Sequence, residues 1–234
     1  MKKKLFSDFL LVGLATIASL FIFSIATRSI GESLPPSRVH PLPATLASWR
    51  DTENRGDYFD ALEKSEVGAL VWSRFPVTVY TRSDRPAWVE LVRGAIGEWN
   101  RYLPLQEVSQ PESADIVIAR EFPPSGVRFN PETRKLEIPR VRSAVTQYEI
   151  FVKDNFLHHR MTVKISPNLS DPSALSAIRH EFGHALGIWG HSPAETDVMY
   201  FSQTRDIPSI SPRDVNTLKK VYEQATRLGW EMGR

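Results

Sequence analysis

The pattern of apolar and polar positions begins with a long apolar stretch at the N-terminus. Residues 9–26 read FLLVGLATIASLFIFSIA, 18 residues without a charge, and three lysines at positions 2–4 precede them. This length reaches the lower limit for spanning a bilayer, and small residues up to Ala26 also suit cleavage by a signal peptidase. We therefore expect residues 1–30 to be either a membrane anchor or a signal peptide.

A proline-rich stretch follows. Residues 34–49 read LPPSRVHPLPATLASW and contain four prolines, which remove backbone donors and favour extended structure. The next residues allow a short helix within 58–70. The pattern predicts that residues 31–70 are a linker and a possible pro-segment, and that residues 71–234 form the folded domain.

Strand and helix periodicities alternate through that domain. Residues 145–152 and 160–166 alternate in polarity, which predicts a hairpin whose long turn places His158 and His159 in solvent. The remaining predicted elements are a strand over 75–81, a helix over about 86–103 and a strand over 114–120 that is buried on both faces.

A further helix is predicted from Asp171 to about residue 186. Asp171 is a suitable N-cap and Pro172 suits the first turn. Apolar residues recur along it at helical spacing, so that one face is buried in the core. These residues are Leu175, Ile178, Phe182 and Leu186.

The end of this helix carries the candidate chemistry, in the segment HEFGHALGIWGH over residues 180–191. His180 and His184 are four residues apart and therefore face one point. Gly187 can take a positive φ, end the helix and return His191 towards them. Three histidines suit zinc with a position left for water, and Glu181 lies where it can act as general base on that water.

These residues match the metzincin zinc-peptidase motif H-E-x-x-H-x-x-G-x-x-H position for position. Ser192 after the third histidine resembles the matrixin branch, and the DVMY segment at 197–200 resembles its Met-turn, with Met199 beneath the zinc but not a ligand. Gly187 and Met199 would then support the site. The closing helix, which opens at Ser211 with Asp214 at capping-box spacing, is similar to the final matrixin helix.

The resemblance implies an α+β fold of metzincin type. Its features are a twisted, mostly parallel sheet with an antiparallel edge strand, an active-site helix and a C-terminal helix. Substrate would lie extended beside the edge strand, which here is one arm of the hairpin within 145–166.

Composition narrows the function further. Lys and Arg number 29 against 27 Asp and Glu, mixed along the chain, so there is no nucleic-acid footprint. The chain has no cysteine, which excludes thiolate ligands, a cysteine nucleophile and latency through a pro-segment cysteine on the zinc.

We therefore expect a zinc metalloendopeptidase that hydrolyses peptide bonds through a zinc-bound water activated by Glu181. Its partners would be a peptide or protein substrate and, if the apolar segment is retained, a membrane. The alternative is a non-catalytic zinc-containing module that binds peptides or proteins on the same fold. Metal binding alone does not need Glu181, which favours the enzyme.

The basic flank at 2–4 and the apolar stretch predict an extracytoplasmic domain, either membrane-anchored or secreted. A fusion after Arg234 to alkaline phosphatase, which is active only outside the bacterial cytoplasm, should be active. Activity of a fused reporter that works only inside the cytoplasm would contradict this extracytoplasmic localisation.

Overall fold

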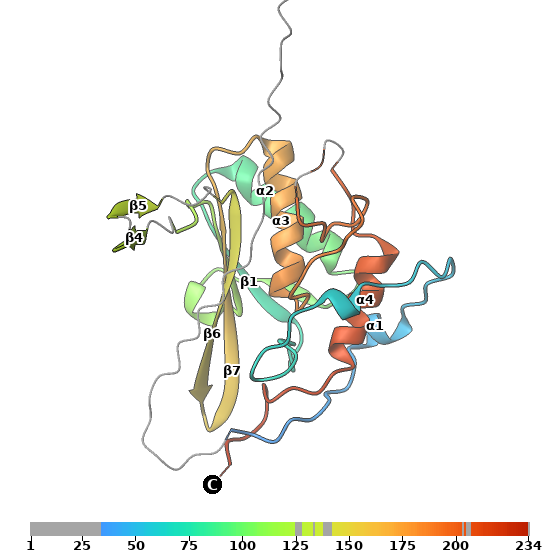
Figure 1. The fold of residues 1–234 in the computed structure, drawn as a ribbon. Helices are drawn as coiled ribbons and strands as arrows, with labels where there is room; N and C mark the ends of the chain where they lie inside the picture. The colour runs from blue at the N-terminus through green and yellow to red at the C-terminus, as the bar shows by residue number, and fades with distance from the viewer. Residues whose placement is uncertain are drawn as a thin grey trace, which may run out of the picture.

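A computed structural model describes residues 34–124, 128–132, 134–137, 142–202, 204 and 207–233. Five of the strands form the main sheet and two form a separate small hairpin (Figure 1). In chain order the elements are α1 Ala44–Ser48, η1 Phe59–Ala61, β1 Val77–Arg82, α2 Pro86–Trp99, β2 Leu105–Glu107, η2 Pro111–Ser113, β3 Ile116–Ala119, β4 Arg128–Asn130, β5 Lys135–Glu137, β6 Ala144–Lys153, β7 Phe156–Ile165, α3 Asp171–Ala185 and α4 Pro212–Tyr222.

The main sheet confirms the predicted α+β architecture. Its strand order is β2-β1-β3-β7-β6, and every neighbouring pair is parallel except β7 and β6. The edge strand β6 is therefore antiparallel, as predicted. Helix α3 packs against α2 and against the strands β6 and β7, which places the histidine-bearing helix beside the antiparallel edge of the sheet (Figure 1).

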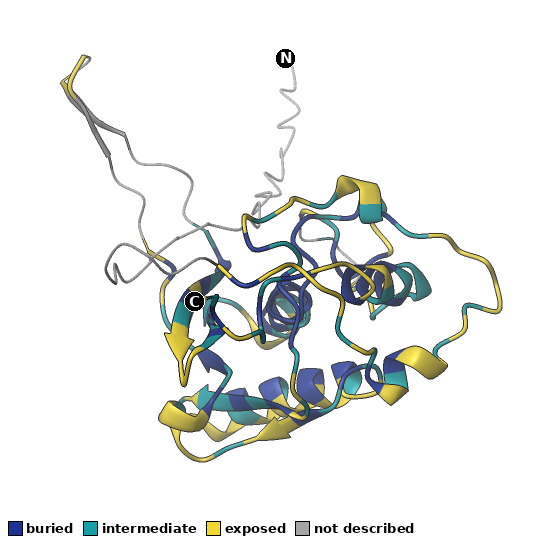
Figure 2. Cartoon of the chain, turned by 90° about the horizontal axis from the view of Figure 1, so that it is seen from below, coloured by how far each residue is buried: buried dark blue, intermediate teal, exposed yellow. Residues whose placement is uncertain are grey.

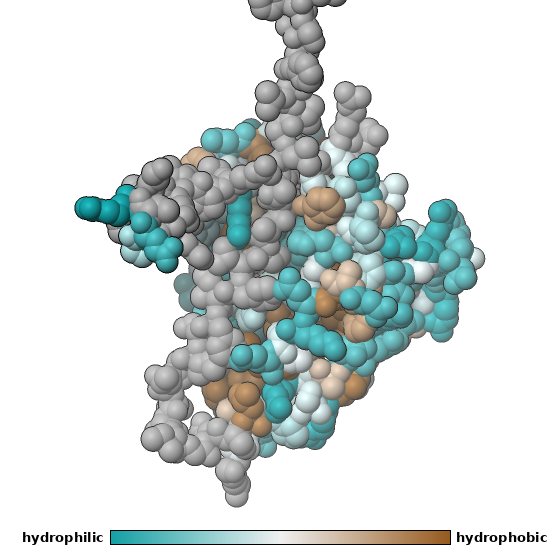
Figure 3. Space-filling view, viewed as in Figure 1, coloured by the Kyte–Doolittle hydropathy of each residue, from teal (hydrophilic) through white to brown (hydrophobic). Residues whose placement is uncertain are grey.

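Burial follows the layers. All four residues of β3 are buried, as expected for a strand covered on both faces, whereas β7 alternates between buried and half-buried residues. Figure 2 shows the inner sides of the helices buried and the outer loops exposed. On the face seen in Figure 3, apolar side chains form small patches between hydrophilic ones.

The hairpin of β6 and β7 corrects the sequence prediction. Its connection is not a long turn but the two residues Asp154 and Asn155, whose φ angles are 51° and 66°. Positive φ at both central residues matches the twist of a hairpin, and Asp and Asn tolerate it. His158 and His159 therefore belong to β7 and not to a turn.

Two helix predictions also need adjustment. The helix predicted over 86–103 ends at Trp99, and α3 is capped by Ser170, whose side chain accepts from the backbone N–H of Ser173. Asp171 is thus the first residue of α3 and not its cap. The short helix predicted within 58–70 is only the three-residue turn η1.

The proline-rich segment and the residues after it run along the domain and bury side chains in its core. Leu46, Val67 and Leu70 are at most 2% exposed, and they belong to the same apolar cluster as the sheet and α3. The backbone of Arg38 pairs with that of Thr226 near the C-terminus. The predicted anchor or signal segment, 1–30, lies outside the described residues, and none of the described helices is long and apolar enough to cross a membrane.

The burial of Leu46 gives a test of how firmly this segment belongs to the domain. Leu46 is 0% exposed, so Leu46→Ala should lower the free energy of unfolding by about 2–5 kcal/mol. Leu34 is 44% exposed, and Leu34→Ala should change the stability by less than about 0.5 kcal/mol. Chemical denaturation of both variants measures the difference, and equal, small effects would mean that the segment packs loosely.

Candidate metal centre

Three histidines converge at the C-terminal end of α3. Their candidate ligand nitrogens, from His180, His184 and His191, all lie within 4.8 Å of one another. The Nε2 atoms of His180 and His184 are 3.1 Å apart. The structure therefore brings together the three histidines that the sequence proposed as ligands.

Two backbone carbonyls set the proton positions on the helix histidines. His180 Nδ1 is 2.9 Å from the carbonyl oxygen of Val198, and His184 Nδ1 is 2.6 Å from that of Ile188. A carbonyl only accepts, so each Nδ1 carries the proton and each Nε2 presents a lone pair. The same arrangement fixes the ring orientation of metal-binding histidines generally.

The resulting site fits a metal cation. Two facing lone pairs at 3.1 Å repel each other, and the buried Nε2 of His191 has no hydrogen-bond partner among the described residues. Burial lowers the pKa of His180 to about 3 and also lowers the pKa of His184 and of His191, so all three rings are neutral near pH 7. Two nitrogens bound to one tetrahedral zinc lie about 3.3 Å apart, close to the observed separation.

Glycines shape the turn that returns His191. Gly187 has a φ of 123°, and a Cβ there would be 3.1 Å from the carbonyl oxygen of Leu70. Gly190 has a φ of 149°, and a Cβ there would be 2.9 Å from the carbonyl oxygen of Ala61. The sequence singled out Gly187 but not Gly190, because the need for Gly190 comes from a segment far earlier in the chain.

That earlier segment is bonded to the turn itself. The N–H of Glu63 donates to the carbonyl oxygen of Trp189 at 2.7 Å, and Leu62 forms an isolated bridge with Gly190. Trp189 also stacks on His184, with ring centroids 5.8 Å apart. The residues around η1 therefore support the backbone on which the third histidine stands.

Met199 lies against the histidine helix. It is fully buried, and a Cβ at Gly183 would be only 2.1 Å from its sulfur. Gly183 lies between His180 and His184 in the sequence, so the sulfur packs on this part of the helix, where the absence of a Cβ leaves room for it. The motif does not mark this glycine as required, although it stands within the motif, because its contact is with Met199 later in the chain.

Asp214 ties the segment 197–200 to α4. Its carboxylate accepts from the N–H of Val198 at 3.0 Å and from the hydroxyl of Tyr58 at 2.6 Å, in addition to its predicted capping-box bond with Ser211. Val198 is the residue whose carbonyl holds His180. Burial, the largest cause, raises the pKa of Asp214, and its hydrogen bonds counter that shift.

Glu181 lies on α3 between the two helix histidines and is completely buried. Its Oε2 accepts from the hydroxyl of Thr146 on β6 at 2.6 Å, while its Oε1 has no hydrogen-bond partner among the described residues. Burial raises the pKa of Glu181 to about 8, and the Thr146 bond and the charge of Arg142 act in the opposite direction. Thr146 thus orients the carboxylate and leaves one oxygen available.

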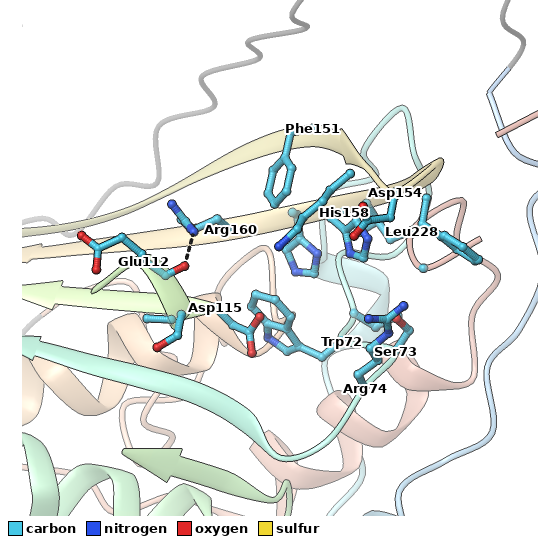
Figure 4. A pocket seen from close by; sticks show the side chains of 17 residues that line it. Trp72, Ser73, Arg74, Glu112, Asp115, Phe151, Asp154, His158, Arg160 and Leu228 are labelled. Carbon is cyan, nitrogen blue, oxygen red and sulfur yellow. Dashed lines mark hydrogen bonds between the residues drawn. The ribbon is translucent and has the colours of Figure 1, made fainter. Parts of the chain in front are cut away.

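His158 and His159 are not the solvated turn residues that the sequence predicted, since on β7 His158 is half-buried and His159 is buried. His159 is 6% exposed and stacks on Trp72 with ring centroids 3.9 Å apart, and burial lowers its pKa to about 3. Both line a cavity of about 320 Å³ at the hairpin end of the sheet, with Arg74 and Asp115 (Figure 4). The three clustered histidines are not among its lining residues, so this cavity is separate from the candidate metal centre.

Comparison with known proteins gives distant likenesses. No protein-family model and no curated protein matches the sequence. Two solved structures of myroilysin match with 16% and 14% sequence identity and TM-scores of 0.39 and 0.38. They cover 67% and 75% of this chain and 99% and 98% of the myroilysin chains. At these values the likeness transfers no property, and the site rests on its own geometry.

The space around two glycines predicts opposite changes in stability when each is replaced by alanine. Gly183→Ala places a methyl group into the buried sulfur of Met199, so it should cost about 1–3 kcal/mol of stability and weaken metal binding. Gly94, on α2, has open space where a Cβ would stand, with nothing within 4 Å, so Gly94→Ala should stabilise by about 0.5–1 kcal/mol. Thermal unfolding and metal titration of both variants measure this, and a neutral Gly183→Ala would contradict the packing role of Met199.

Proposed function

We propose that this chain is a zinc-dependent metalloendopeptidase of the metzincin type. The observation that carries the proposal is the convergence of three neutral imidazoles, from His180, His184 and His191, beside the buried carboxylate of Glu181. Structural metal sites are commonly closed by a fourth protein ligand, whereas catalytic zinc sites have three protein ligands and an open position.

Zinc is the metal that best suits these donors. The cluster offers three imidazole nitrogens, and the chain contains no cysteine that could supply sulfur. When bound, zinc would supply Lewis-acid chemistry, lowering the pKa of water and polarising a carbonyl group.

Glu181 would move the proton. Its Oε1 is available to accept a proton from water, and Thr146 prevents the carboxylate from rotating by holding Oε2. A divalent cation nearby would lower the pKa of Glu181 from its buried value, which favours the ionised base near pH 7. Glu181 would then return the proton to the nitrogen of the leaving amine.

The substrate would be a peptide or an unfolded protein segment in extended form. Strand β6 ends the sheet order, and its residue Thr146 holds Glu181, so its outer edge lies next to the site. An extended peptide can pair with such an edge through main-chain hydrogen bonds. This pairing would present a peptide bond to Glu181 and the three histidines.

The finer assignment is to the matrixin-like branch, in an extracytoplasmic protein. Ser192 follows the third histidine, and its hydroxyl donates to Asp197, which also accepts from Arg213 at 2.9 Å. These bonds support the chain between His191 and Met199. The location is proposed from the sequence of residues 1–30, and the alkaline phosphatase fusion tests it.

The role of Glu181 is tested by Glu181→Gln, which retains the size of the side chain. Zinc should stay near one equivalent per chain, while casein hydrolysis should fall by at least about 10²-fold because the proton acceptor is gone. His184→Ala should instead lose the zinc. Metal analysis and a fluorescent casein assay on the purified chain measure both.

A zinc-loaded chain that cleaves no member of a broad peptide library, but binds peptides equally with Glu181 or Gln, would establish the binding module and not the enzyme. Equal hydrolysis by wild type and Glu181→Gln would remove Glu181 from the reaction. Full zinc occupancy after His184→Ala would contradict the ligand set.

A further inference from the structure

Arg142 has an unusual position immediately before the edge strand β6. Its side chain is half-buried, and its Nη1 is shielded from solvent without a hydrogen-bond partner in the part of the chain that the structure describes. A guanidinium has five N–H donors and no acceptor, so it is satisfied only by oxygen acceptors or water. A buried donor without such a partner is costly.

Comparable arginines of the domain have their acceptors within the chain. Arg120 donates to the carbonyl oxygen of Pro167 at 2.6 Å, and Arg160 donates to that of Glu112 at 3.2 Å. Arg213 is paired with Asp197 at 2.9 Å. Arg179 also has a buried Nε without a partner, but its Nη2 donates to Glu98. Arg142 has a buried Nη1 without an acceptor and forms no ion pair with a described carboxylate, so a ligand is the natural source of an acceptor.

Arg142 also lies near the proposed reaction centre. It stands four residues before Thr146, the residue that holds Glu181, and its charge is close enough to lower the pKa of Glu181. The two groups do not form an ion pair within 4.0 Å. Glu181 Oε1 and Arg142 Nη1 are both buried and have no partner among the described residues, so they are separated groups and not an internal pair.

The direction of β6 decides which part of a substrate would meet Arg142. β6 runs from Ala144 to Lys153, and antiparallel pairing is the more stable arrangement for an added strand. The C-terminal part of an antiparallel peptide lies beside the beginning of β6. With the scissile bond near Thr146 and Glu181, Arg142 flanks the residues that follow this bond.

We propose that Arg142 binds a carboxylate of the substrate on the C-terminal side of the scissile bond. The inference rests on the proposed peptidase function and names its substrate preference. A carboxylate matches the planar fork of a guanidinium, accepts two parallel hydrogen bonds from it and carries the opposite charge, whereas a neutral carbonyl group carries none. Its source is either an acidic side chain or the carboxyl terminus of a short substrate.

The test uses fluorescence-quenched peptides built on one casein site that the full-length enzyme cleaves. Each of the three positions after the scissile bond carries in turn an acidic residue, Asp or Glu, or its neutral match, Asn or Gln. Every peptide is made with an amidated and with a free C-terminus. The wild type should prefer a carboxylate at one position by at least about tenfold in kcat/KM. If the amidated peptides already show a preference for acidic residues, the bound carboxylate belongs to a side chain. If only the peptides with free C-termini are preferred, the bound carboxylate is that of the chain terminus.

Arg142→Gln should reduce the ratio of kcat/KM for acidic and neutral peptides to about one, mainly through KM. Arg142→Lys should restore part of the ratio because it retains the charge without the planar fork. Arg160→Gln is the matched control, since it removes the same charge from the middle of β7, and it should leave the ratio unchanged. A binding measurement adds an independent readout: in the Glu181→Gln background, anisotropy of a fluorescein-labelled acidic peptide should show the same loss with Arg142→Gln.

Three results would overturn the inference. These are equal cleavage of acidic and neutral peptides by the wild type, a ratio unchanged in Arg142→Gln, and a uniform fall in kcat for all peptides in Arg142→Gln. The last result would place the guanidinium on the reacting carbonyl group. Failure of the zinc-loaded wild type to cleave any peptide would instead refute the peptidase function, which separates the two claims.

Discussion

The candidate metal centre depends on two buried imidazoles whose unprotonated nitrogens the fold holds close together. His180 and His184 present unprotonated Nε2 atoms to each other at 3.1 Å, and their other nitrogens are committed to backbone carbonyls. Neither ring can relieve the contact by a tautomer change without losing its carbonyl bond. The fold therefore favours a cation between the rings, and the surrounding residues keep the rings in place to receive it.

Several segments that are far apart in the sequence hold the histidines and Glu181 in position. Residues 197–200 supply the Val198 carbonyl and the Met199 sulfur, and the carboxylate of Asp214 on α4 accepts from the N–H groups of Val198 and Met199. Strand β6 supplies Thr146, which orients Glu181. Displacement of any one segment would disturb the candidate metal centre, because each contact fixes the position of the next.

The sequence predicted the features that depend on local geometry. Helical spacing placed His180 and His184 on one face, and the freedom of Gly187 predicted the return of His191. Alternating and continuous apolar runs predicted the strands that correspond to β1, β3, β6 and β7, whereas the antiparallel edge of the sheet was implied by the family resemblance and β2 was not predicted. These signals are readable because they arise within one or two turns of the same element.

Features that depend on contacts between distant parts of the chain could not be predicted from the sequence. Gly183 and Gly190 are required by Met199 and by the carbonyl of Ala61, neither of which is a neighbour in the sequence. Thr146 and Asp214 acquire their partners only when β6 and α4 meet the histidine helix and its Met-turn. His159 resembled a polar turn residue, since alternation alone does not reveal that Trp72 covers it.

The contact between the N-terminal segment and the histidine turn has a thermodynamic consequence. Because the N–H of Glu63 is bonded to the carbonyl of Trp189, two residues before His191, the docking of this segment and the position of the third histidine are coupled equilibria. Coupling free energies are reciprocal, so a cation that orders His191 must also tighten the docking of the segment by the same amount. Metal binding would therefore be accompanied by slower backbone hydrogen exchange in a segment that contributes no ligand.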